Sequence, residues 1–130
     1  MVRFMPTMAA AGLALIRWAE GGVPLPRHPR LLRGADERTV LLDGHGNALG
    51  GVRLPEISVP TAVYDGTTTG QAPHRRPFSA EKLRSLYPTD EAYVNSVRAA
   101  VAECLLRDVI LPDRAAEYLA DAARGPIAQG

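Results

Sequence analysis

The sequence predicts an α+β fold: an N-terminal helix, a small antiparallel hairpin or sheet around residues 38–64, and three C-terminal helices. One observation behind this prediction is that residues 43–60 hold four of the twelve glycines and two of the eleven prolines. They separate short apolar runs, which is typical of strands joined by turns. The other is that residues 93–105 repeat apolar side chains at helical spacing, which indicates an amphipathic helix.

Length and composition indicate one region in the 130 residues, with a mainly aliphatic core. Within this region we expect a helix with a hairpin over residues 7–64, a loop over residues 65–77 and a helical part over residues 78–124. Fifteen basic and fourteen acidic residues give a net charge of +1, so neither nucleic acid nor a membrane is an expected partner. A single cysteine excludes an internal disulfide and a multi-cysteine metal site.

Residues 7–20 are predicted to form a helix, because Thr7 can act as its N-cap and Gly21-Gly22 supply a favoured helix end. The same stretch could be a secretory signal peptide. Against that reading, Arg17 and Glu20 follow the apolar centre at once and no A-x-A cleavage site is present. We therefore favour a buried helix, find no convincing signal peptide, and leave the compartment unassigned.

Residues 23–34 carry three prolines and are predicted to be an extended linker. Arginines surround His28 in this linker and could form an anion site, although a solvated loop is the commoner case. Residues 57–64 are predicted to be an edge strand, because Pro60 lacks the N–H that a central strand needs. The polar residues 65–77 are expected to form a surface loop.

The hairpin itself is predicted from three adjoining segments. Residues 38–42 have the β-branched and apolar character of a short strand. Asp43 to Asn47 contain Asp-Gly and Gly-Asn, which favour turns with positive φ. Residues 48–54 are predicted to return as the second strand, with Gly50-Gly51 marking a bulge or a close backbone approach.

Three consecutive helices are predicted within residues 78–124. Ser79 and Thr89 are placed as N-caps of the first two, and Pro112 lies near the N1 position of the third. The tail 127–130 is expected to fray. The apolar stripe of the middle helix comprises Tyr93, Val97, Ala100, Val101, Cys104 and Leu105.

Motifs for nucleotide binding and acyl transfer lack the context that they need. The glycines from Gly44 to Gly50 approximate G-x-G-x-x-G, but the third is one place late and the following Val-Arg-Leu-Pro cannot open a helix. Residues 79–82 match the S-x-x-K of penicillin-recognising enzymes, yet S-D-N and K-T-G are absent and an N-cap explains Ser79. No G-x-S-x-G elbow occurs around any of the four serines, Ser58, Ser79, Ser85 and Ser96. We therefore predict no catalytic nucleophile and no cofactor.

The histidines and the cysteine give only weak candidates for chemistry. His28, His45 and His74 lie in predicted loops without repeated spacing, so we predict no metal site. His45, flanked by glycines and close to Asp43, is the best general-base candidate, although most turn histidines are simply solvated. Cys104 is predicted to be a buried apolar residue rather than a reactive thiolate. The run His74-Arg75-Arg76 could meet a phosphate or carboxylate, but a solvated loop is the commoner case.

Several of these segments, in this order and spacing, resemble the C-terminal part of a bacterial α/β-hydrolase-domain family. The resemblance extends over residues 9–124. Its clearest part is the glycine-rich NALGGVRLP of residues 47–55, followed by VPTAVY at residues 59–64. Further matches are LALIRWAEGGVPLP at 13–26, an R-x-P-R-L segment near Arg27 to Leu31, Pro77-Phe78, Leu86-Tyr87, 91–94, 97–100 and 111–113.

The resemblance implies an α/β-hydrolase-like parent protein in which this region is the C-terminal portion. In that family the nucleophilic Ser and, as we expect, the base His precede the Trp-bearing helix, so no catalytic residue carries over to this sequence. We expect a piece of an esterase-like hydrolase domain that does not catalyse hydrolysis alone. Its partner would be the missing N-terminal hydrolase portion or another protein. The alternative is a small protein-interaction module built on the three C-terminal helices.

Overall fold

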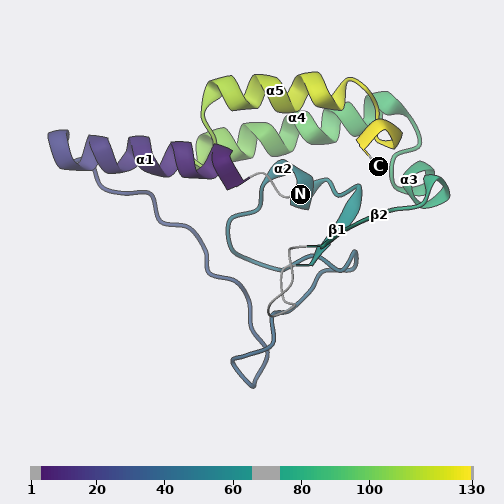
Figure 1. The fold of residues 1–130 in the computed structure, drawn as a ribbon, viewed down its shortest axis with the longest axis horizontal. Helices are drawn as coiled ribbons and strands as arrows, with labels where there is room; N and C mark the ends of the chain where they lie inside the picture. The colour runs from purple at the N-terminus through teal and green to yellow at the C-terminus, as the bar shows by residue number, and fades with distance from the viewer. Residues whose placement is uncertain (1–3, 66–73, 130) are drawn as a thin grey trace.

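The computed structural model describes residues 4–65 and 74–129 and confirms the α+β class, with an N-terminal helix, an antiparallel two-stranded sheet and C-terminal helices (Figure 1). The elements in chain order are α1 Phe4–Gly21, α2 Pro55–Ser58, β1 Ala62–Asp65, β2 His74–Pro77, α3 Ala80–Leu86, α4 Asp90–Leu106, α5 Pro112–Ala122 and a 3₁₀ turn at Ile127–Gln129.

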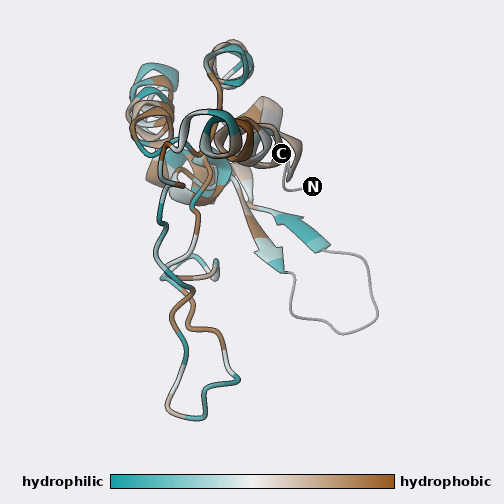
Figure 2. Cartoon of the chain, turned by 90° about the vertical axis from the view of Figure 1, so that its left-hand side faces the viewer, coloured by the Kyte–Doolittle hydropathy of each residue, from teal (hydrophilic) through white to brown (hydrophobic). Residues whose placement is uncertain are grey.

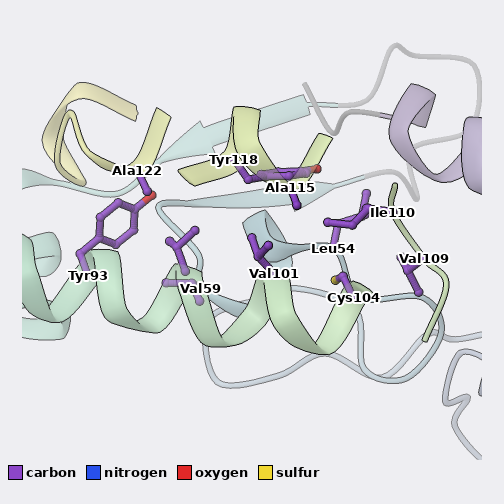
Figure 3. Close-up of a cluster of buried hydrophobic side chains, with 11 residues drawn as sticks. Leu54, Val59, Tyr93, Val101, Cys104, Val109, Ile110, Ala115, Tyr118 and Ala122 are labelled. Carbon is purple, nitrogen blue, oxygen red and sulfur yellow. The ribbon is translucent and has the colours of Figure 1, made fainter. Parts of the chain in front are cut away.

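The core lies where α4 and α5 pack side by side and α2 meets α4 (Figures 1 and 3). The predicted stripe of α4 faces this core, because Tyr93, Val97, Val101 and Cys104 are buried. Burying such side chains contributes roughly 1.5–3 kcal/mol each. The other core residues are Leu54, Val59, Val109, Ile110, Ala115, Tyr118 and Ala122.

The caps predicted for the C-terminal helices are confirmed. The Ser79 hydroxyl accepts a hydrogen bond from the Lys82 N–H at 3.2 Å, and the Thr89 hydroxyl accepts one from the Ala92 N–H at 3.1 Å. Pro112 occupies the first turn of α5. The expectation that the tail frays is wrong for Ile127–Gln129, which form the 3₁₀ turn.

The segment around Pro60 differs from the edge strand predicted for residues 57–64. Residues Pro55–Ser58 form the short helix α2, because Pro55 is pre-set for the first helical turn. β1 then begins at Ala62 and pairs antiparallel with β2, with Ala62 opposite Pro77 and Asp65 opposite His74. The expectation of a loop over residues 65–77 is therefore wrong at both ends, and residues 66–73 lie outside the described part.

The hairpin predicted between residues 38 and 54 is present only as isolated bridges, including Leu42 opposite Ala48. The predicted turn is there, since the Asp43 N–H donates to the Asn47 carbonyl at 2.7 Å. The linker, residues 23–34, lies against the two arms of this turn as a third segment. Backbone N–H groups donate from Leu32 to Leu49, from Leu49 to Leu41 and from Leu41 to Leu32, and so tie the three segments together. Figure 2 shows the region as long irregular chain away from the helices.

Helix α1 begins before the predicted residue 7, so Thr7 lies within the helix and is not its N-cap. The predicted end is confirmed: the Gly22 N–H donates to the Trp18 carbonyl at 3.0 Å and Gly22 adopts a φ of 66°. From its first turn beside the body, α1 projects away from the α4–α5 pair (Figure 1). Within the described residues no helix meets both the length and the apolarity that crossing a bilayer requires.

Candidate functional site

The glycine-rich turn is organised by the carboxylate of Asp43. One oxygen, Oδ1, accepts hydrogen bonds from the backbone N–H groups of His45 and Asn47, each at 2.9 Å. The other, Oδ2, accepts from Arg53 Nη2 at 2.8 Å. Partial burial tends to raise the pKa of Asp43, but the hydrogen bonds from Arg53, Asn47 and His45 outweigh it and hold that pKa below its ordinary value.

Arg53 and Asn47 connect this turn to the rest of the molecule. Arg53 also donates to the carbonyls of Ala48 at 2.6 Å and Ile57 at 3.1 Å, so it ties the turn to α2. The Asn47 side chain is 0 % exposed and lies against β1. It donates to the Ala62 carbonyl at 3.2 Å and accepts from the Tyr64 N–H at 2.8 Å. These polar groups are used for structure, so the turn is a scaffold rather than a ligand cradle.

His45, the general-base candidate of the sequence, lies at this turn with its ring 6.1 Å from that of Phe78. The Asp43 carboxylate bonds to the backbone N–H of His45 and to Arg53, not to the imidazole. In the described part of the chain, no carboxylate is hydrogen-bonded to the ring in the way that orients the base of a catalytic triad. The absence of catalytic residues remains a prediction.

A cavity of about 310 Å³, the linker cavity, is lined by His28 of the linker together with Ser58, Glu103 and Cys104. Serine, histidine and an acid are the residue types of acyl transfer, and residues so far apart in sequence gave no local signal. Their contacts point elsewhere. Glu103 pairs with Arg107 at 2.6 Å, and the Cys104 thiol donates to the Arg53 carbonyl at 3.4 Å.

The thiol of Cys104 is protected rather than activated. Its residue is buried, as the sequence predicts, and burial raises its pKa to about 11, with Glu103 and Glu56 adding to the effect. A thiolate is the nucleophilic form of cysteine, so this environment suppresses nucleophilic attack near neutral pH.

A second cavity, of about 220 Å³, lies between α2, the sheet, α4 and α5. We call it the tyrosine pocket. Burial raises the pKa of Tyr93 in this pocket to about 12; the nearby Tyr64 and the carboxylates of Glu56 and Asp121 raise it further, and Arg75 opposes them. The polar side chains of the tyrosine pocket are Glu56, Thr61, Tyr64, Arg75, Tyr93, Tyr118 and Asp121.

The remaining candidates from the sequence do not meet at one place. His74 and Arg75 lie on β2, where Arg75 is opposite Tyr64 and reaches the tyrosine pocket. The expectation of a loop at His74-Arg75-Arg76 is therefore wrong, because these residues pair with β1, whereas His74 and Arg76 are exposed to solvent as expected. Across residues 4–65 and 74–129, no three His, Cys, Asp or Glu side chains gather in a way that could hold a metal ion.

These features describe an α+β chain with a helical core, a structural glycine-rich turn, the linker cavity and the tyrosine pocket. A family model described as alpha/beta hydrolase domain matches residues 1–120, so this chain belongs to the alpha/beta hydrolase domain family. No curated protein and no solved structure matches the chain.

Proposed function

We propose that this chain is the C-terminal, structural segment of an esterase-like α/β hydrolase, and that the nucleophile comes from protein outside these 130 residues. The observation that carries this proposal is the outward face of α1, an apolar surface that the described residues leave open. In an α/β hydrolase, helices cover both faces of a central sheet. The outward face of α1 is the surface on which the nucleophile-bearing part would pack.

Helix α1 is apolar on opposite sides. Its inner face holds Ala10, which is 3 % exposed, and borders a small cavity shared with Asp108 and Leu111 of the body. Its outward face is defined by Met5, Met8, Leu15 and Ile16, whose side chains are between 52 % and 73 % exposed.

The only charged residues of α1 are Arg17 and Glu20, near its C-terminal end. A helix that is apolar all round is typically buried on all sides in a larger protein or in a membrane. Among the described residues, no helix combines the length and the apolarity that a membrane span needs. We therefore assign the outward face of α1 to a contact with another protein layer.

The serines support the same proposal. The Ser79 hydroxyl caps α3, and the Ser96 hydroxyl donates to the Ala92 carbonyl at 2.9 Å. Ser58 ends α2 and lines the linker cavity together with His28, but it has no glycines next to it in the sequence, as a serine elbow would need. Ester hydrolysis by this class of enzyme needs a nucleophile on a strained elbow with a base next to it, and these serines do not have that setting.

Charge substitution on α1 tests the proposal. We expect the double variant Leu15→Glu/Ile16→Glu to reduce binding of a hydrophobic dye and self-association, while the unfolding midpoint stays near that of the unmodified chain. The matched control is Ala10→Glu, which places a carboxylate on the inner face and should lower that midpoint. Dye binding that survives the double variant, or a loss of stability equal to that of the control, would contradict the assignment.

The interaction module of three helices stays an alternative proposal. The apolar stripe of α4 is buried in the core and is not available to a partner. The exposed apolar side chains of α1 therefore make α1 a better candidate for a docking face than the three C-terminal helices. The alternative requires that the purified chain be a stable monomer that binds little dye. Our proposal requires an open apolar face that the dye detects.

A further inference from the structure

The linker cavity has no part in the function proposed above, although the linker, residues 50–53, α2 and α4 all line it. We propose that it binds a small uncharged aromatic alcohol. Its volume of about 310 Å³ lies at the lower end of the roughly 300–1,000 Å³ of small-molecule sites. A ligand with a single ring therefore fits its size.

Hydrogen bonds hold the walls of the linker cavity in place. The Gly51 N–H donates to the Arg30 carbonyl at 3.0 Å and fixes the linker next to residues 50–53. The Cys104 thiol donates to the Arg53 carbonyl at 3.4 Å and fixes the same residues to α4. Because the linker and α4 are both tied to residues 50–53, the cavity is formed before a ligand arrives. A ligand therefore binds without the cost of ordering these segments.

The carboxylate and guanidinium groups that line the cavity are paired, which selects an uncharged ligand. Arg53 is bound by Asp43 at 2.8 Å, and Arg107 is bound by Glu103 at 2.6 Å. Both side chains of the second pair are more than half exposed, so solvent screens their charges further. A charged ligand would lose hydration on entry and would find no charge in these pairs left to balance its own.

The apolar part of the lining favours an aromatic ring. Pro29, Val52, Ala100 and Val109 contribute hydrocarbon surface, and Cys104 adds a sulfur atom. Burial raises the pKa of the Cys104 thiol to about 11, so the sulfur is in its uncharged, protonated form near neutral pH. Polarizable sulfur makes favourable contacts with aromatic rings, so a ring is better matched to this wall than an alkyl chain of equal size.

His28 and Ser58 select a hydroxyl group on the ligand, since both line the cavity. A neutral imidazole has one donor and one acceptor nitrogen, and a serine hydroxyl both donates and accepts. A ligand hydroxyl also does both, so it is matched to either side chain. An amine or a carboxylic acid that offers similar hydrogen bonds is charged near neutral pH, which the paired charges of the lining disfavour.

Titration of the isotope-labelled full chain with benzyl alcohol, followed by NMR, tests the proposal. We expect saturable shifts of the amides of Gly51, Val52 and Val109, which line the cavity. The comparison ligands benzoate and benzylammonium have the same ring and carry one negative and one positive charge. We expect each to bind about tenfold more weakly or worse, because the cavity does not balance its charge. Toluene, which lacks the hydroxyl, should also bind more weakly than the alcohol.

Ala100→Leu fills the cavity from α4 and should abolish these shifts, whereas the control Ala102→Leu adds the same atoms at an exposed position of that helix and should leave them unchanged. Should Ala100→Leu prevent folding as judged by circular dichroism, Val52→Phe fills the cavity from a position that is 40 % exposed. Shifts that do not saturate, equal affinity for any comparison ligand, or full affinity in a folded variant of either cavity position would overturn the proposal. Because the shifts are read at the cavity, they do not depend on the contact assigned to α1.

Discussion

At the scale of single residues, Asn47 joins the glycine-rich turn to the sheet. Its buried amide satisfies the Ala62 carbonyl and the Tyr64 N–H, which would otherwise lack partners at this place. We expect Asn47→Ala to lower the free energy of unfolding by about 2–4 kcal/mol, because two backbone groups lose their hydrogen bonds. Urea denaturation measures this value. Asn95→Ala removes an exposed amide that bonds to Arg98 and should change stability by less than about 0.5 kcal/mol.

Asp43 makes the stability of this region depend on pH. Its pKa is below the ordinary 3.8 in the folded chain, so its contribution is fully present above that value and is lost as pH falls through the folded pKa. We expect stability to decrease below about pH 4 in the unmodified chain and to decrease less in Asp43→Asn. Urea midpoints between pH 3 and 6 measure the difference. Equal slopes for both chains would contradict the role given to this carboxylate.

At the scale of the elements, local signals were enough for the helices. The hydroxyl caps at Ser79 and Thr89 and the apolar spacing of α4 depend on residues within one or two turns, and the sequence displays them directly. β2 gave no such signal. His74-Arg75-Arg76 has no apolar alternation, and it becomes a strand by pairing with β1.

The two cavities could not be predicted for the same reason. The tyrosine pocket combines Glu56, Arg75 and Asp121, which are separated by long stretches of chain and meet only through packing. Likewise, His28 and Ser58 line one cavity only because the linker and α4 both border it. Sequence spacing reports neighbours on one element, not neighbours between elements.

The linker and the turn region approach each other closely at Gly50. This glycine adopts a φ of 74°, and a Cβ there would lie 2.4 Å from the Arg30 carbonyl oxygen. We expect Gly50→Ala to break the bridge to Leu31 and to accelerate tryptic cleavage after Arg30 by about tenfold or more.

The matched control for this variant is Gly44→Ala. A Cβ at Gly44 would meet nothing within 4 Å, so the cleavage rate should stay at that of the unmodified chain. Equal cleavage rates for the Gly50 variant and the unmodified chain would show that the linker is not fixed at this bridge.

At the scale of the whole molecule, the core is concentrated at α2, α4 and α5, and Cys104 reports on its integrity. The thiol is buried and its pKa is raised to about 11. We expect negligible reaction with a thiol reagent at pH 8 in the folded chain and complete reaction in urea, because labelling requires opening of the core. Rapid labelling without denaturant would mean that the chain alone does not hold this core.

We propose that α1 packs its open face against another part of a hydrolase and that this chain does not hydrolyse esters by itself. An assay of p-nitrophenyl ester hydrolysis by the purified chain tests it most directly, with Ser58→Ala, His28→Ala and His45→Ala as comparison variants. We expect no turnover above buffer for the unmodified chain and no difference among the four proteins. Robust turnover that Ser58→Ala or either histidine variant abolishes would contradict it.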